Sequence, residues 1–291
     1  MKKAGNLIGL RFIETNIVCP KHNRKKIKVP RGAFKNVPQQ YLEPFCLECF
    51  EEKREQELDS FRTNMFINET TGFLSRVSLL PNKSELSHTF DNFNLPTVKN
   101  NDNIAIVEQK NACIEALKEA KKLAQKYVDE PDSSFNTLMF GKAGTGKTHL
   151  AIAMLNYINQ NSKPRQRCLF LSLNLLLEKR QAHVENAENN NWDNDYLRKI
   201  VSKADVVVVD DLGAETPNHS SYNQSGASNF TQKAINIIYD SNARIITTTN
   251  YSLKDFYKTY DQRLVSRILS NAKGHMIDFS KVVDYRIFGG K

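Results

Sequence analysis

The stretch that decides the fold is GKAGTGKT, which runs from Gly141 to Thr148. Its spacing is G-x-x-x-x-G-K-[ST], in which glycines let the backbone turn sharply so that successive N–H groups point at the phosphates of a nucleoside triphosphate. Lys147 is expected to reach the β- and γ-phosphates, and the hydroxyl of Thr148 is expected to hold Mg²⁺. The residues predicted to bind ATP in this loop are Gly141, Gly144, Thr145, Gly146, Lys147 and Thr148.

The sequences on both sides of this loop predict the strand and the helix that a phosphate loop joins. Residues 137–140 form a short apolar run that is typical of a buried strand. Residues 148–160 repeat apolar side chains at helical spacing, and the positive end of that helix would face the phosphates. A glycine-rich turn that matched the motif by accident would lack this context.

An acidic strand end completes the predicted site. Residues 205–211 read DVVVVDD, and four β-branched residues followed by acids indicate a buried parallel strand. Asp210 is predicted to orient the ligands of Mg²⁺, and Asp211 lies where a general base for the attacking water belongs. Residues 168–173 predict another strand between the loop and these acids. That order is typical of ATPases with an inserted strand rather than of Ras-like GTPases.

Three polar residues further along the chain are candidates for the same site. Asn250 ends a predicted strand over residues 244–250 and is expected to position water near the γ-phosphate. Residues 261–269 predict a helix on which Arg263 and Arg267 share a face. An arginine delivered to the ATP of a neighbouring subunit would stabilise transition-state charge. The plainer alternative is a pair of solvated arginines.

The amino-terminal part carries a metal-binding pattern. Cys19 and His22 form a C-x2-H pair, and Cys46 and Cys49 form a C-x2-C pair after a spacer of 23 residues. Two such pairs supply the four ligands of a tetrahedral zinc site with no open position, which predicts a structural Zn²⁺. A small segment with few large apolar residues needs such a clamp, because its own core buries too little surface.

The composition predicts a globular cytoplasmic protein. Hydrophobic residues make up 40% of the 291, and no apolar run is long enough to cross a bilayer or to form the core of a secretory signal. The net charge of +9 is compatible with nucleic-acid binding. A run of basic residues between Lys21 and Lys35 indicates either a phosphate-contacting patch or a solvated loop. Cys113 and Cys168 are expected to be core thiols rather than ligands.

Taken together, these motifs resemble those of the AAA+ ATPases of the DnaC/DnaI helicase-loader group. The resemblance rests on GKAGTGKTHLA, VVVVDDLGAE, ITTTNYS and RLVSRIL, with HTFDNF at residues 88–93 similar to the entry segment of that ATPase domain. It implies a parallel five-stranded sheet flanked by helices. It also makes Arg267 the better arginine-finger candidate and implies that the zinc domain contacts the replicative helicase.

The expected layout is a zinc-binding domain at residues 1–70, a linker at 71–87 and an AAA+ domain at 88–291. The short stretch after the last predicted strand, near residues 276–279, leaves room for no more than a minimal lid, and Arg286 is the one late candidate for a nucleotide contact. Residues 185–195 are expected to form a surface loop.

The function expected from this layout is that of a replicative helicase loader. It would assemble with copies of itself through Arg267 and bind single-stranded DNA. The alternatives are a transposition helper ATPase of the IstB type, a small-molecule kinase, and an adaptor that binds ATP without hydrolysing it.

Overall fold

A computed structural model describes residues 11–31, 39–96, 104–185, 192–214, 228–282 and 284. The chain divides into two compact units, Met1–Asn68 and Glu69–Lys291. In the first unit, strands β1 (Ile13–Val18) and β2 (Lys25–Lys28) pair antiparallel, followed by helix α1 (Gln39–Leu42) and the start of the long helix α2 (Leu47–Val77). The rings of Phe45, Tyr41 and Phe50 pack with centroids 5.5–5.7 Å apart and form a small aromatic core.

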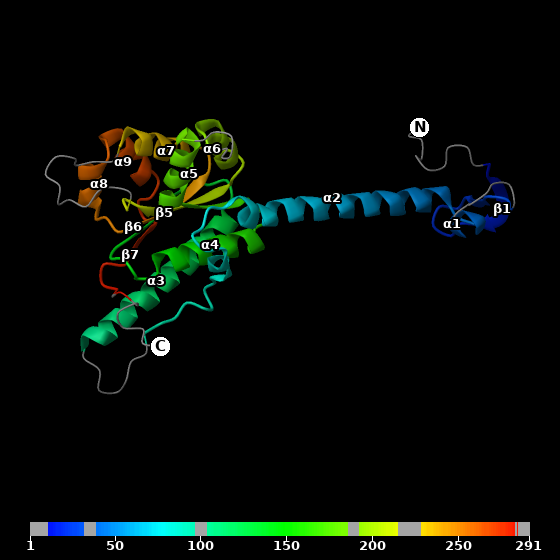
Figure 1. The fold of residues 1–291 in the computed structure, drawn as a ribbon. Coiled ribbons are helices and arrows are strands. Elements are labelled where there is room, and N and C mark those ends of the chain that lie inside the picture. Colours follow the sequence, from blue (N-terminus) through cyan, green and yellow to red (C-terminus); the bar gives the residue numbers. More distant parts are fainter. Residues whose placement is uncertain are drawn as a thin grey trace. The chain divides into compact units, whose positions relative to one another are not determined.

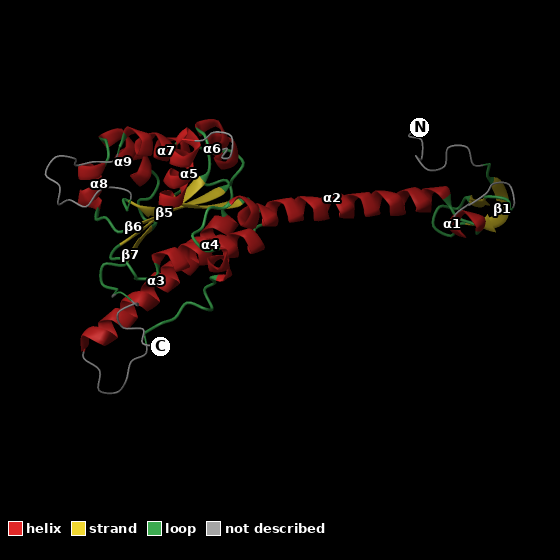
Figure 2. Ribbon diagram, in the orientation of Figure 1, coloured by secondary structure: helices red, strands yellow, loops and turns green. Residues whose placement is uncertain are grey.

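The second unit is built on a five-stranded parallel sheet (Figures 1 and 2). Its strands are β3 (Thr137–Phe140), β4 (Cys168–Ser172), β5 (Val206–Leu212), β6 (Arg244–Thr249) and β7 (Met276–Asp278), in the order β4-β5-β6-β3-β7. Strand β6 therefore lies between the strand that leads into the phosphate loop and the strand that carries the two acids. This arrangement confirms the predicted five-stranded parallel sheet.

Helices cover both faces of this sheet (Figure 1). On one face lie α3 (Ile104–Asp129) and α4 (Lys147–Asn161), and on the other lie α5 (Leu173–Glu185), α6 (Asn194–Val201), α7 (Asn229–Tyr239), α8 (Leu253–Thr259) and α9 (Gln262–Leu269). Alternate side chains of a strand point to opposite faces. Val206 and Val208 accordingly join the core under α4, whereas Val207 and Val209 join the core under α5 and α7.

The segment expected to be a linker, residues 71–87, is instead part of the second unit. Helix α2 continues to Val77, and its residues Phe73 and Leu74 are buried in the two cores of the second unit. Residues 83–87 form a short 3-10 helix, η1. The backbone of Leu79 bridges to β4, receiving a hydrogen bond from Ser172 N–H and donating one to the carbonyl of Phe170. The physical reason is that β4 is an edge strand, whose backbone groups need partners. Polar composition alone did not reveal this pairing.

The predicted strands of the sheet and the predicted helices at 148–160 and 261–269 lie within two residues of their expected bounds, and Cys113 and Cys168 are buried as core thiols. The expected surface loop at 185–195 falls largely outside the described residues. The minimal lid stays a prediction, because only residues 279–282 and 284 are described after β7. None of the described helices is long and apolar enough to span a bilayer.

Candidate functional site

The phosphate loop lies between β3 and α4, and its backbone can be built only with glycine at three positions. Gly141, Gly144 and Gly146 have φ angles of +137°, +73° and +91°, in the region that side chains disfavour. A Cβ at Gly141 would lie 2.6 Å from the backbone carbon of Phe279, and one at Gly146 would lie 2.7 Å from the ring of Phe93. The loop is therefore packed between the entry segment and the residues that follow β7.

Lys147 is held inside this loop by oxygen atoms that accept its hydrogen bonds. Its buried ammonium donates to the carbonyl oxygens of Gly141 at 2.9 Å and Lys142 at 2.6 Å, and to Oδ1 of Asn250 at 2.8 Å. The contact with Asn250 spans 103 residues of sequence. It arises because β6 is the sheet neighbour of β3, so that the ends of the two strands meet at one edge. The two predicted site residues are thus brought together.

Asp210 lies at the same edge and contacts the first turn of α4. Its Oδ1 accepts hydrogen bonds from Thr148 Oγ1 at 2.9 Å and from Thr248 Oγ1 at 2.6 Å. Burial, and then the neighbouring charge of Asp211, raise the pKa of Asp210 to about 6, against the opposing effect of the two hydroxyl hydrogen bonds. A hydroxyl and a carboxylate are the oxygen ligands that Mg²⁺ prefers, and a cation would offset this electrostatic cost. The pair therefore fits the predicted magnesium site.

Asp211 adopts an unusual backbone conformation for the residue expected to act as a general base. Its φ is +59°, in the left-handed region. Its backbone N–H donates to Thr248 Oγ1 at 2.9 Å, and its side chain is half-buried at the strand end. Thr248, which contacts both acids, was missed by the sequence analysis, because a threonine inside a strand carries no motif of its own.

The entry segment supplies an aromatic wall beside the loop. The rings of His88 and His149 stack with centroids 4.1 Å apart, and the ring of Phe93 meets that of His149 edge-on at 5.2 Å. Burial lowers the pKa of both histidines, which favours their neutral forms. His149 was also missed from sequence, since its only signal is its place directly after Lys147 and Thr148.

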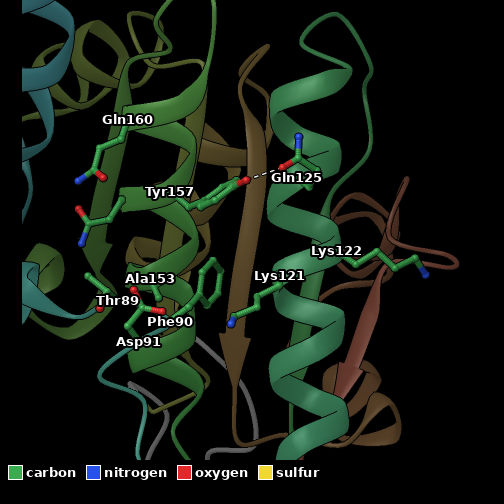
Figure 3. A pocket seen from close by; sticks show the side chains of 10 residues that line it. Thr89, Phe90, Asp91, Lys121, Lys122, Gln125, Ala153, Tyr157 and Gln160 are labelled. Atoms are coloured by element: carbon green, nitrogen blue, oxygen red, sulfur yellow. Dashed lines mark hydrogen bonds between the residues drawn. The ribbon is translucent and has the colours of Figure 1, made fainter.

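A separate cavity of about 510 Å³ lies between α3, α4 and residues 89–91 (Figure 3). The ammonium of Lys121 lies 5.8 Å from the ring centroid of Phe90, and the hydroxyl of Tyr157 donates to the amide oxygen of Gln125. No residue of the phosphate loop lines this cavity. This cavity is therefore separate from the loop at which the sequence predicts the nucleotide.

Arg267 lies on α9 and is held by α7. It donates to Oδ1 of Asn236 at 2.6 Å and forms an ion pair with Asp240 at 3.1 Å, while 45% of its side chain remains exposed. Its contacts in the described part of the chain are thus to α7 and not to the phosphate loop. Arg263 is exposed one turn earlier, and Arg286 lies outside the described residues.

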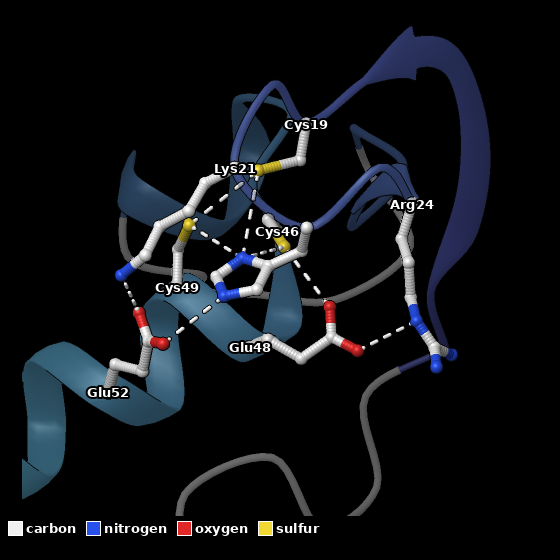
Figure 4. Close-up of polar contacts among 8 residues, drawn as sticks. Cys19, Lys21, Arg24, Cys46, Glu48, Cys49 and Glu52 are labelled. Carbon is white, nitrogen blue, oxygen red and sulfur yellow. Dashed lines mark hydrogen bonds and ion pairs between the residues drawn. The ribbon is translucent and has the colours of Figure 1, made fainter.

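In the first unit, Cys19, His22, Cys46 and Cys49 converge (Figure 4). His22 Nδ1 lies 3.8, 3.5 and 3.3 Å from the sulfurs of Cys19, Cys46 and Cys49, and the sulfurs of Cys19 and Cys49 are 3.7 Å apart. Tetrahedral zinc with its usual bond lengths places such ligand atoms about 3.5–3.8 Å apart. The four predicted ligands are therefore arranged as a zinc ion requires.

Charged neighbours orient this cluster (Figure 4). Glu52 lies 3.1 Å from His22 Nε2 and pairs with Lys21 at 2.5 Å, which directs Nδ1 of the imidazole toward the sulfurs. A hydrogen bond from the backbone N–H of His22 lowers the pKa of Cys19 to about 6. Part of the basic run is neutralised here, since Arg24 pairs with Glu48 in the same way as Lys21 pairs with Glu52.

The fold and this site define a P-loop ATPase of the AAA+ class. The ammonium of Lys147, the acid Asp210 and the strand-end amide of Asn250 meet at one edge of a parallel sheet with the order β4-β5-β6-β3-β7. The sequence profile of the bacterial DnaA ATPase domain matches residues 111–273, more than half of the chain. The chain belongs to that family.

The individual relatives that match are replication initiators and helicase loaders. The chain is 27% identical over 200 residues to the chromosomal replication initiator protein DnaA of Geotalea uraniireducens (strain Rf4), covering 62% of this chain and 41% of the relative. It is 27% identical over 150 residues to the replicative helicase loader DnaC of Escherichia coli (strain K12), covering 50% and 55%. The match to DnaC confirms the predicted resemblance to the loader group. The chain spans about half or less of the length of these relatives.

Solved structures of such proteins overlap with this chain in part. A crystal structure of the DnaC helicase loader has a TM-score of 0.47 and 21% sequence identity, covering 68% of this chain and 99% of that one. A crystal structure of DnaI has a TM-score of 0.45 and 21% identity, covering 72% and 95%.

Proposed function

We propose that this chain is an ATP-dependent loader of a replicative ring helicase that acts in the cytoplasm. The observation that supports it is that a phosphate loop with Lys147, Asp210 and Asn250 at one sheet edge occurs in the same chain as a Cys₃His cluster in a separate compact unit. The first unit would dock on the helicase, and the second would bind single-stranded DNA and ATP. The similarity to DnaC supports the same role.

Within the ATPase site each residue has a proposed task. Bound ATP would supply the phosphoanhydride bond whose cleavage drives release of the helicase, and Mg²⁺ would neutralise phosphate charge. Lys147 would move its hydrogen bonds from loop carbonyls to phosphate oxygens, and Asp210 with Thr148 would hold the cation. Asp211 would accept the proton of the attacking water while Asn250 orients that water.

The docking role of the first unit is tested with the helicase from the same source. The full chain and the helicase are mixed and separated by size-exclusion chromatography, with and without ATP. We expect co-elution that depends on the four zinc ligands, and loading of the helicase on single-stranded DNA that depends on ATP. Absence of any complex under both conditions would refute the loader assignment.

We predict that Arg267→Ala reduces ATP-dependent assembly and lowers kcat by about 10³-fold, the lower end of the range for an arginine finger. The reason is that Arg267, which α7 holds partly exposed, would act on the ATP of the neighbouring copy. Hydrolysis and sedimentation are measured for this variant, with Arg263→Ala as the matched control on the same helix.

A mixing experiment tests whether Arg267 acts in trans. Arg267→Ala keeps an intact phosphate loop, and Lys147→Ala keeps an intact Arg267, so mixed assemblies contain some complete sites. We expect the mixture of these two inactive variants to recover part of the hydrolysis rate. A mixture as inactive as its components would show that Arg267 does not complete the neighbour's site.

The family match favours a second candidate, a replication initiator that binds duplex origin DNA. The observation behind it is the profile match at residues 111–273 and the DnaA relatives themselves. Fluorescence anisotropy with single-stranded DNA and with origin duplex separates the two. A loader is expected to prefer the single strand and to need the helicase, whereas an initiator binds the duplex specifically without it.

A further inference from the structure

Strand β6 carries three consecutive threonines in the buried middle of the sheet. Thr247, Thr248 and Thr249 are each no more than 1% exposed, in a kind of strand that is usually rich in valine and isoleucine. A buried hydroxyl is costly unless it is hydrogen-bonded. Thr247 pairs with the hydroxyl of Tyr239 at 2.6 Å, and Thr249 donates to the carbonyl of Leu212 at 2.6 Å. The hydroxyls of Thr247 and Thr249 therefore connect β6 to neighbouring elements, α7 and β5.

Thr248 differs from its neighbours because its hydroxyl bonds to both acids of the site. Its Oγ1 donates to Asp210 Oδ1 at 2.6 Å and accepts from the backbone N–H of Asp211 at 2.9 Å. A hydroxyl has one proton to donate and two lone pairs to accept with, so one side chain can satisfy both partners.

The reason for this double contact is a bulge in β5. Val209 pairs with Thr247 and Leu212 pairs with Thr249, so Asp210 and Asp211 together oppose the single residue Thr248. A bulge leaves the extra residue outside the ladder and redirects its side chain. The N–H of Asp211, in its left-handed conformation, is satisfied by the Thr248 hydroxyl instead of by a carbonyl of β6.

The hydrogen bond from Thr248 to Asp210 becomes more important when Mg²⁺ binds. Two hydroxyls, those of Thr148 and Thr248, reach Oδ1 of Asp210 in this structure. Thr148 is the residue expected to turn toward Mg²⁺. Thr248 would then be the remaining hydroxyl that fixes the orientation of the Asp210 carboxylate.

We propose that Thr248 is a positioning residue of the ATPase site, which sets the carboxylate of Asp210 and the backbone of Asp211 through one hydroxyl. Thr248 would thereby fix the position of Asp210, the proposed cation ligand, relative to Asp211, the proposed base. This inference rests on the proposed hydrolysis of ATP. Residues that orient metal ligands in this way typically change metal affinity or activity by about 10–100-fold when they are replaced.

The test replaces the hydroxyl by a methyl group of the same shape, Thr248→Val. We expect kcat to fall at least about tenfold and the Mg²⁺ concentration for half-maximal hydrolysis to rise several-fold, on the order of the effects seen for such residues. Nucleotide affinity without Mg²⁺ should stay at the wild-type value, because Lys147 and the loop are untouched. Thr248→Ser, which keeps the hydroxyl, should restore most of the activity.

The matched control is Thr247→Val, one residue earlier in the same buried strand, whose hydroxyl bonds to Tyr239. It should leave the Mg²⁺ requirement unchanged. An equal loss of kcat in both valine variants, with equal loss of thermal stability and no rescue by serine, would show a structural role only and overturn the inference. Wild-type behaviour of Thr248→Val would overturn it as well. If Thr248→Val does not fold, Thr248→Ala is measured in its place.

Failure of the inference and failure of the proposed function are distinguishable. A wild-type chain that binds ATP but does not hydrolyse it would refute the proposed ATPase activity. Binding of a fluorescent ATP analogue as a function of Mg²⁺ concentration then still tests Thr248. A higher Mg²⁺ requirement in Thr248→Val than in Thr247→Val supports the positioning role, and equal requirements overturn it.

Discussion

Replacing Lys147 with alanine is expected to abolish ATP hydrolysis and to weaken ATP binding by at least about 100-fold, the scale expected when a buried, charge-assisted contact is lost. Lys147 is the cation that the loop buries, and its partners include two backbone carbonyls and the amide of Asn250. The variant loses both the charge that meets the phosphates and the link to β6. Isothermal titration with ATP and a phosphate-release assay measure the two effects.

The matched control is Lys142→Ala, because Lys142 is exposed in the same loop and contributes its backbone carbonyl rather than its ammonium. It should keep ATP binding within a few-fold of the wild type. Lys147→Ala should still bind the helicase through the first unit while it fails to load it. Wild-type affinity for ATP in the Lys147→Ala chain would remove the basis of the whole assignment.

Sequence alone predicted that Lys147, Asp210 and Asn250 lie at one edge of the sheet, because each of them follows a recognisable local pattern. The glycine spacing around Lys147 and the apolar run before Asp210 both report a strand end, and parallel strand ends meet at one edge of the sheet. The contact between Lys147 and Asn250 then follows from the strand order. Local pattern and fold agree at these positions.

The features that sequence missed depend on pairing between distant segments. The bulge at Asp211 is defined by the register of β5 against β6, and the residues of β5 alone do not predict that register. Likewise, the backbone of Leu79 completes the edge of β4, although its own segment has the polar composition of a linker. The contact of Glu52 with His22 spans 30 residues, so the spacing of the zinc ligands did not reveal it.

The zinc ligands were predictable because each pair is close together in the sequence. Two-residue gaps within each pair specify a knuckle, and the structure brings both knuckles together at the start of α2, where Cys49 lies in the first turn. The core of the first unit is small, with Val29 and Tyr41 its buried members among the described apolar residues other than the cysteines. Such a core cannot offset the entropy of ordering the chain, so the metal is expected to supply the difference.

We therefore expect Cys49→Ser to lose the bound zinc and to unfold the first unit. Structural zinc sites contribute about 10–16 kcal/mol of apparent binding free energy, which far exceeds the net stability of a segment of this size. Zinc content by atomic absorption, proteolysis of the first unit and co-elution with the helicase should all change together. The control is Cys113→Ala, a thiol of α3 buried in the core of the ATPase unit, which should leave the zinc content at one ion per chain.

The ATPase unit should survive this loss, because its two cores and its phosphate loop contain none of the four ligands. ATP affinity of the Cys49→Ser chain should match that of the wild type, while helicase binding disappears. Retention of a folded, helicase-binding first unit without zinc would contradict the structural role of the metal. Loss of ATP binding in the same variant would instead show that the two units do not fold independently.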